Sequence, residues 1–267
     1  MKLVRLSLIL AILLFANFGF ANVWMDENFD DGIAFDDVDV YSYNPLVYPV
    51  NITRNGTLTT SRFFDAPDSY QLSTGQSVFV TPPYQDQKNG PFQYFQFAVS
   101  LDSIPAPGNV GIFRWNWLLD TLNYSFYVKF VSTGTIVNIV AGEDAIGSTS
   151  LVIGSINDTQ TWKFITVQVQ KNTAADNDTR PEVNRSGVAH GVYFFVNSKT
   201  PGLSILLGTA DVNDTAKDWS INVSSGSLFL DTMYWEGGLP SAYVAQGINE
   251  LIKDLETGLP VSDWVLY

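Results

Sequence analysis

Large apolar residues alternate with small or polar ones through the middle of the chain. The alternation is clearest in Phe95–Leu101, Tyr124–Phe130 and Ile165–Gln170. A period of two places one face of a strand on a core and the other in water. Further strands are predicted at Ile136–Ala141, Leu151–Ser155, Gly191–Asn197, Ser204–Leu207 and Ser227–Trp235. Gly, Asn, Asp and Pro separate these stretches at short intervals, which indicates an antiparallel sandwich or barrel.

One helix is predicted near the end of the chain, over residues 241–256. Its apolar residues fall on one stripe, Ser241 can cap its start and Gly258 can end it. We interpret this helix as covering an open end or edge of the sandwich, and a partner-binding helix is the alternative. The polar stretch 172–186 is predicted to be a surface loop, so residues 22–267 are expected to form one domain.

The first 21 residues have the layout of a secretory signal peptide. Lys2 and Arg5 precede the apolar run Leu6–Phe15, and the small residues Gly19 and Ala21 favour cleavage before Asn22. The alternative is a membrane anchor, but a span needs about 20 apolar residues. No second apolar stretch of that length follows. The mature chain is therefore predicted to be secreted or at the cell surface (periplasmic or extracellular), without a membrane span.

The chain is acidic and has no cysteine. It holds 14 Lys and Arg against 27 Asp and Glu, a net charge of −13. Loss of residues 1–21 would leave 12 positive against 27 negative side chains, a net charge of −15. Such a chain repels phosphate backbones, so nucleic acid is not an expected partner. Without cysteine, disulfides, zinc–thiolate sites and thiol nucleophiles are excluded.

Four segments carry a resemblance to a known superfamily. They are the aromatic and acidic start Trp24–Gly32, the Trp-led strand Thr161–Val167, the strand and turn Val192–Ser198, and the late strand Leu228–Trp235. In this order they resemble the concanavalin A-like, laminin-G-like jelly rolls of exported proteins. The resemblance covers most of residues 24–236 and implies an antiparallel jelly-roll β-sandwich. It does not by itself imply a function.

No catalytic arrangement stands out. Jelly-roll glycosidases that act on β-glucans flank the scissile bond with closely spaced carboxylates on one strand, and no such Glu-x-Asp-x-Glu pattern occurs here. His190 is the only histidine and has no nucleophile elbow nearby. We therefore assign no catalytic residue.

Acidic residues gather near the predicted mature N-terminus. Calcium prefers several oxygen ligands, and jelly rolls often tie their first and last strands together with one ion. Asp30, Asp31 and Asp231 are the predicted ligands of a structural Ca²⁺ ion. The alternative is a solvated acidic edge that discourages aggregation.

Asn-x-Ser/Thr sequons are dense, and each is a candidate N-glycosylation site. They lie at Asn51, Asn55, Asn123, Asn157, Asn177, Asn184, Asn213 and Asn222. Glycans at these positions would coat the domain and favour a surface or matrix role.

Tryptophans supply the last candidate site. Trp115 and Trp117 share one strand face, and Trp235 lies beside Glu236 near a strand end. Sugar sites stack ligands on aromatic faces beside carboxylate or amide groups, so these four residues are the predicted ligand-binding set. The alternative is that the rings fill the core.

Together these features predict an exported, non-catalytic jelly-roll module that binds carbohydrate or another extracellular surface ligand. A structural, assembling cell-surface or matrix protein is the first alternative. A diverged polysaccharide-degrading enzyme is the second. Paired carboxylates on a concave face would favour the enzyme, and a long unpaired edge strand would favour assembly.

Overall fold

The described part of the chain is all-β, as predicted. The computed structural model describes residues 22–35, 51–64, 67–81, 92–119, 122–144, 149–159, 161–170, 190–198, 201–208 and 215–237. These contain fifteen strands: β1 (Asn22–Glu27), β2 (Asn51–Arg54), β3 (Thr57–Thr59), β4 (Ser69–Ser73), β5 (Ser77–Thr81), β6 (Phe92–Leu101), β7 (Gly108–Leu119), β8 (Leu122–Ser132), β9 (Val137–Glu143), β10 (Ser150–Ile156), β11 (Lys163–Gln170), β12 (His190–Val196), β13 (Leu203–Gly208), β14 (Thr215–Val223) and β15 (Ser227–Gly237). The predicted helix 241–256, the signal segment 1–21 and the loop 172–186 lie outside the described residues. Within the described ranges, no helix has the length and apolar character needed to cross a membrane.

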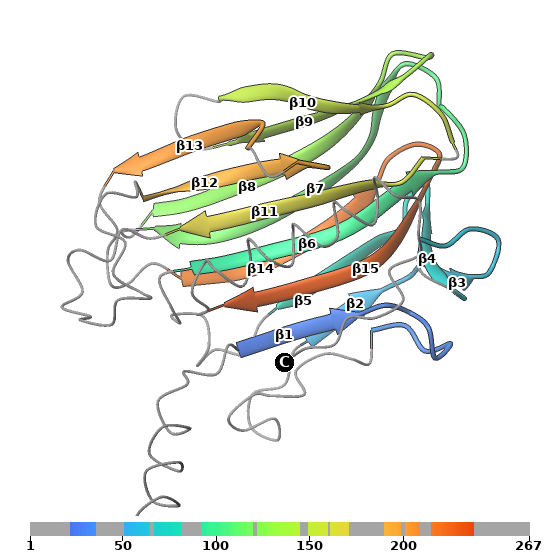
Figure 1. Cartoon of the computed structure of the whole chain (residues 1–267), viewed down its shortest axis with the longest axis horizontal. Helices are drawn as coiled ribbons and strands as arrows, with labels where there is room; N and C mark the ends of the chain where they lie inside the picture. Colours follow the sequence, from blue (N-terminus) through green and yellow to red (C-terminus); the bar gives the residue numbers. More distant parts are fainter. Residues whose placement is uncertain are drawn as a thin grey trace, which may run out of the picture.

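The strands form two antiparallel sheets stacked face to face (Figure 1). The eight-stranded sheet has the order β13-β12-β11-β6-β15-β4-β3, and β1 also pairs with β15. The seven-stranded sheet has the order β10-β9-β8-β7-β14-β5-β2. The fold is therefore a β-sandwich with strands β13 and β10 at neighbouring ends of the two sheets.

The predicted strands are all present, with ends that shift by a few residues. Alternation identified β6, β8 and β11 because each has one face on the core. The prediction that the other face lies in water is wrong for β6, where Gln96 and Ser100 are also buried. The short strands that the sequence did not predict are β2 and β3 at the sheet edges and β4 and β5 beside them. β14 was also missed, because charged residues interrupt its alternation at Lys217 and Asp218.

The core lies between the two sheets and is rich in aromatic rings. On β6, Phe95 and Phe97 point inward, and their rings pack against Phe113 of β7 at centroid distances of 4.9 and 5.3 Å. Trp219 of β14 packs on Phe95 at 4.6 Å. Aromatic pairs of this kind add about 0.5–1.5 kcal/mol beyond the area that they bury.

Strand β15 contains a bulge at its centre. Its register against β6 shifts between Asp231 and Tyr234, and Thr232 has a φ of 47°. A β-branched residue in this left-handed region is strained by about 1–3 kcal/mol. The bulge separates the half of β15 that pairs with β4 from the half that pairs with β1.

Candidate functional site

The tryptophans predicted to bind ligand are core residues. Trp115, Trp117 and Trp235 are each 0% exposed. Their rings pack on one another, with centroids 5.2 Å apart for Trp115 and Trp117 and 6.3 Å apart for Trp115 and Trp235. A fully buried ring cannot stack on a sugar, so the prediction that these three rings form a binding platform is wrong. The side chain of Glu236 lies outside the described residues.

The predicted calcium ligands are not brought together. Asp30 and Asp31 are exposed in the turn after β1, whereas Asp231 is fully buried in β15. Among the described residues, no three His, Cys, Asp or Glu side chains form a group that could hold a metal ion. The oxygens of Asp231 accept hydrogen bonds from the backbone N–H groups of Phe64 and Thr232, each at 2.7 Å. The ligand set is therefore not supported by the structure, and calcium binding stays a prediction.

The sequons in the described residues lie on strands of one sheet or directly after them. Asn51 is in β2, Asn55 follows β2, Asn123 is in β8, Asn157 follows β10 and Asn222 is in β14. All these strands belong to the seven-stranded sheet. The side chains of the last four are exposed, as a glycosylation acceptor must be. Asn177, Asn184 and Asn213 lie outside the described residues.

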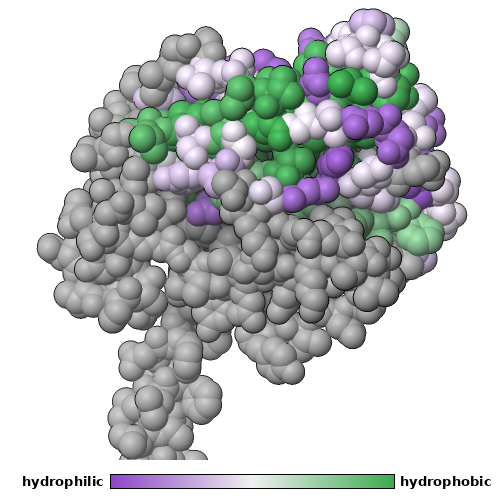
Figure 2. All heavy atoms as spheres, turned by 45° about the horizontal axis from the view of Figure 1, so that its top comes forward, coloured by the Kyte–Doolittle hydropathy of each residue, from purple (hydrophilic) through white to green (hydrophobic). Residues whose placement is uncertain are grey.

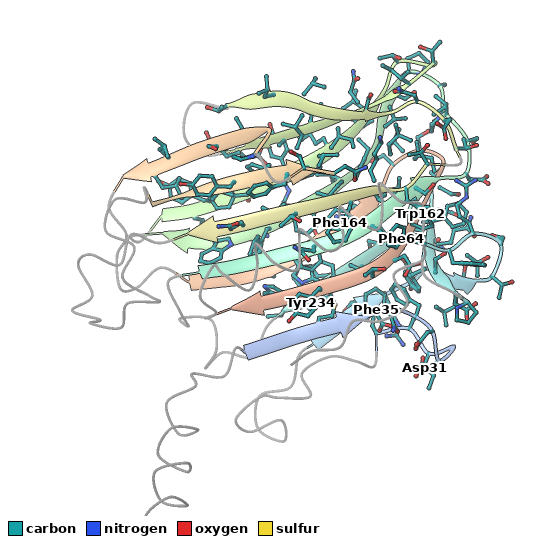
Figure 3. The ribbon with its side chains drawn as sticks, in the orientation of Figure 1. Asp31, Phe35, Phe64, Trp162, Phe164 and Tyr234 are labelled. Atoms are coloured by element: carbon teal, nitrogen blue, oxygen red, sulfur yellow. The ribbon has the colours of Figure 1, made fainter. Side chains whose placement is uncertain are left out.

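An aromatic corner forms where two loops meet the outer face of the eight-stranded sheet. We use this name for Phe63 and Phe64, from the loop between β3 and β4, and Trp162, which directly precedes β11. The rings of Phe64 and Trp162 are T-shaped at 6.0 Å, both half-buried, and pack on Ala98 of β6 and Phe164 of β11. Phe63 is 44% exposed. Figure 3 shows Phe64, Trp162 and Phe164 gathered at one end of the sheet.

Polar groups surround the aromatic corner. The guanidinium of Arg62 donates hydrogen bonds to Ser100 Oγ at 2.8 Å and to the Leu101 carbonyl at 2.6 Å. The central carbon of this guanidinium lies 5.4 Å from the ring centre of Phe229. In the other loop, the Asp158 carboxylate accepts hydrogen bonds from the backbone and hydroxyl of Thr161, both at 2.8 Å. The corner therefore places ring surface beside polar side chains whose positions are fixed by hydrogen bonds within the chain.

Backbone hydrogen bonds fix the position of Trp162. Phe164 donates its N–H to the side chain of Asn197 at 2.6 Å, and Asn197 donates its own N–H to the Phe164 carbonyl at 3.0 Å. Asn197 has a φ of 45°, a conformation that asparagine tolerates better than most residues. The β12 turn thus holds the start of β11 in place.

The outer face continues from the corner across the sheet as a row of polar and aromatic side chains. Tyr234, Gln96, Thr166 and Phe195 lie opposite one another on β15, β6, β11 and β12. The next row includes Gln168 and Tyr193, which are half-buried. Burial raises the pKa of the Tyr193 hydroxyl above its usual value, so this group stays neutral and can donate a hydrogen bond at physiological pH.

Sequence reasoning missed most of this site. Trp162 was noted only as the leading residue of a strand, and Phe63 and Phe64 were not noted at all. The available signal was a pair of aromatics inside a polar segment, Ser61–Asp68. An apolar pair in such a loop either folds back onto the core or forms an exposed patch. The sequence does not decide between these outcomes, because it does not show that the rings of Phe64 and Trp162 are in contact.

Comparisons with known proteins define the fold class and no closer relationship. No family model and no curated protein matches the chain. Solved structures with a similar β-sandwich include several neurotoxin binding domains. The binding domain of botulinum neurotoxin DC in complex with rat synaptotagmin II is 12% identical, with a TM-score of 0.53 over 88% of this chain and 52% of that one.

Two further structures match about as well. The receptor binding domain of botulinum neurotoxin mosaic serotype C/D, with a tetraethylene glycol molecule bound, is 10% identical, with a TM-score of 0.52 over 87% of this chain and 50% of that one. A botulinum neurotoxin type C structure, of a protein that depends on interaction with two ganglioside molecules for entering cells, is 12% identical, with a TM-score of 0.51 over 88% and 51%. The chain spans about half the length of these proteins, and identities this low indicate a shared fold alone.

Proposed function

We propose that this chain is an exported, non-catalytic jelly-roll module that binds carbohydrate, and that the ligand contacts the aromatic corner. The observation that carries the proposal is the half-buried ring pair of Phe64 and Trp162, at a strand end and among hydrogen-bonding groups, with the exposed Phe63 next to Phe64 in the chain. Strand ends joined by loops are where rigid scaffolds place binding residues.

Two further features support a glycan ligand on this face. The sequons of the described residues lie on strands of the seven-stranded sheet or directly after them, so none lies on a strand or loop residue that forms the aromatic corner. In addition, one protein of similar fold interacts with ganglioside molecules, which are carbohydrate-bearing lipids. With a net charge of −13, the chain would repel a polyanionic glycan, so we expect a neutral glycan unless a cation bridges the two.

Export by residues 1–21 is part of the proposal. N-terminal sequencing of protein recovered outside the producing cells should give a chain that begins at Asn22. Retention of Met1 in that material would contradict cleavage at this boundary.

The binding proposal is tested by screening the purified chain on a glycan array and titrating each hit by calorimetry. Loss of a stacking ring costs about 1–3 kcal/mol where aromatics stack on nucleobases. By analogy, Trp162→Ala and Phe64→Ala should weaken binding about five- to 140-fold, since each 1.4 kcal/mol is a factor of ten.

Phe79→Ala is the matched control, because Phe79 is 41% exposed on β5 of the opposite sheet. This variant should bind like the wild type. Melting curves would show whether the two corner variants remain folded. An array without hits, or a hit whose affinity is unchanged in folded Trp162→Ala, would refute the aromatic corner as the glycan site.

A further inference from the structure

One edge of the sandwich is apolar and carries no charge. Strand β13 ends the eight-stranded sheet and β10 ends the seven-stranded sheet. The two strands approach each other closely, because a Cβ placed on Gly202 would lie 2.9 Å from Cβ of Ile153. Residues 149–156 and 201–208 contain no Asp, Glu, Lys or Arg. Figure 2 shows an apolar band on the part of the surface that is turned forward.

The exposed side chains of this edge are large. Leu151 and Val152 of β10 are 50% and 54% exposed, and Leu206 of β13 is 66% exposed. Proteins usually protect edge strands with charges, prolines or bulges. Here the register shifts only at one end of β13, between His190 and Gly191 of its partner, so Leu203 to Leu206 remain in regular pairing. No strand of the described ranges pairs with the other side of that run, and such a side is a template for a further strand.

The exposure of Leu151 indicates that the eight-stranded sheet does not extend far enough at this edge to cover β10. It pairs with Ala141, which is fully buried, so both side chains point between the sheets. Further along β10, Val196 of β12 covers Gly154, since a Cβ on Gly154 would lie 3.1 Å from Cγ1 of Val196. Leu151 is nevertheless half exposed. A strand added beside β13 would extend the sheet over this open position.

We propose that this edge binds a second copy of the chain, with β13 pairing antiparallel to β13 of the other copy. A two-fold axis normal to the sheet makes one edge complementary to itself, because the same residues face each other from both sides. The distribution of charge favours dimerisation through this edge over dimerisation through the rest of the surface. Two copies that each carry −13 repel each other, but the edge itself adds no charge to that repulsion. This inference is independent of glycan binding at the aromatic corner.

Leu206 is the residue that tests the interface most directly. It lies on the outer face of β13, where it packs over Gly191, which has no side chain to cover it. Lysine can replace a side chain that is 66% exposed without disturbing the monomer core, and in the dimer it would put like charges on the same face of the two paired strands, where they repel each other. Leu206→Lys should therefore yield a folded monomer.

Sedimentation of the purified chain over a range of concentrations should show a reversible monomer–dimer equilibrium, and Leu206→Lys should shift it at least tenfold toward monomer. Phe79→Lys is the matched control, because Phe79 is an exposed strand residue on the far part of the seven-stranded sheet. The chain has no cysteine, so single introduced cysteines report proximity without background. Leu206→Cys should be linked into a covalent dimer by a short bismaleimide, and Phe79→Cys should not.

A monomer at every concentration, with no selective linking of Leu206→Cys, would overturn the proposal. So would a dimer that Leu206→Lys leaves intact. Binding of the monomer to neutral phospholipid vesicles, lost in Leu206→Lys, would assign the edge to a lipid surface instead. Glycan affinity should be the same for the wild type and Leu206→Lys.

Discussion

Replacement of Asp231 should destabilise the fold more than replacement of any other single acidic residue in the described strands and turns. Its carboxylate is 0% exposed and accepts backbone hydrogen bonds from Thr232 and Phe64. The first bond holds the strained bulge of β15, and the second anchors the loop that carries the aromatic corner. One buried carboxylate thus links the sheet to the candidate site.

The expected loss follows from these two bonds. A buried donor that is left without an acceptor costs about 1–3 kcal/mol. Asp231→Ala removes the acceptor of two N–H groups, so it should cost about 2–6 kcal/mol. Asp231→Asn keeps the shape and one acceptor oxygen, so it should cost about half as much. Domains are typically stable by about 5–15 kcal/mol, so the alanine variant should be close to unfolding.

Urea denaturation of the two variants measures these losses. Asp30→Ala is the matched control, because Asp30 is exposed in a turn and surface changes usually stay within about 0.5 kcal/mol. The asparagine variant should also bind glycan more weakly while folded, since Phe64 loses part of its anchor. A free energy of unfolding for Asp231→Ala within about 1 kcal/mol of wild type would refute this account of the carboxylate.

Four further outcomes are expected. Burial raises the pKa of the Tyr70 hydroxyl, while a hydrogen bond with the Gly56 backbone and the charge of Arg54 act in the opposite direction. The neutral hydroxyl therefore stabilises the fold below about pH 10, the usual pKa of tyrosine. That contribution is lost as the pH rises through the raised pKa, so Tyr70→Phe should flatten the alkaline decline in Tm. Gly142→Ala should cost about 1–3 kcal/mol in denaturation, because its Cβ would lie 2.5 Å from the Thr149 carbonyl oxygen and from Tyr127 Oη. Calcium at 100 times its dissociation constant would add about 2.7 kcal/mol, and a Tm equal in calcium and in chelator would exclude such a site. If Asn157 is glycosylated, enzymatic deglycosylation should strengthen glycan binding, because this sequon is five residues from Trp162; unchanged affinity would contradict that.

The strands could be predicted because burial imposes a period of two on the sequence. In β7, Arg114 and Asn116 alternate with Trp115 and Trp117, so the sequence shows that the two tryptophans share a face. The polar residues between the two tryptophans also indicate that the tryptophan face is the core face. The prediction that these tryptophans bind a ligand did not follow this pattern.

The burial of Trp235 could not be predicted in the same way. It lies near the end of β15, where an exposed ring is plausible from the sequence alone. Burial there depends on Phe95 and Trp115, whose rings pack on Trp235 from more than 100 residues away in the chain. Contacts over such a distance leave no local pattern in any of the strands. The same reason explains why the contact between Phe64 and Trp162 was not predicted.

Asp231 was predicted as a calcium ligand because it lies on the closing strand. An acidic residue within the apolar stretch Leu228–Trp235 also indicates a buried carboxylate that needs partners. Calcium was one solution to that requirement, and hydrogen bonds from Phe64 and Thr232 are the one in the structure. The sequence could not reveal this, because an N–H donor is present in every residue but proline.

The two outer faces of the sandwich differ in what they can expose to a partner. The seven-stranded sheet carries the sequons, among them the exposed Asn222, and a hydrogen-bonded polar set that includes Asn116, Ser125 and Asp218. These amide and carboxylate groups already satisfy one another, so they gain little from a new ligand. The aromatic corner instead leaves ring surface that neither sheet covers. Apolar surface that stays in water in the folded chain is what a ligand can bury for a net gain. This difference is the reason that we place the proposed ligand site on the face that carries the corner.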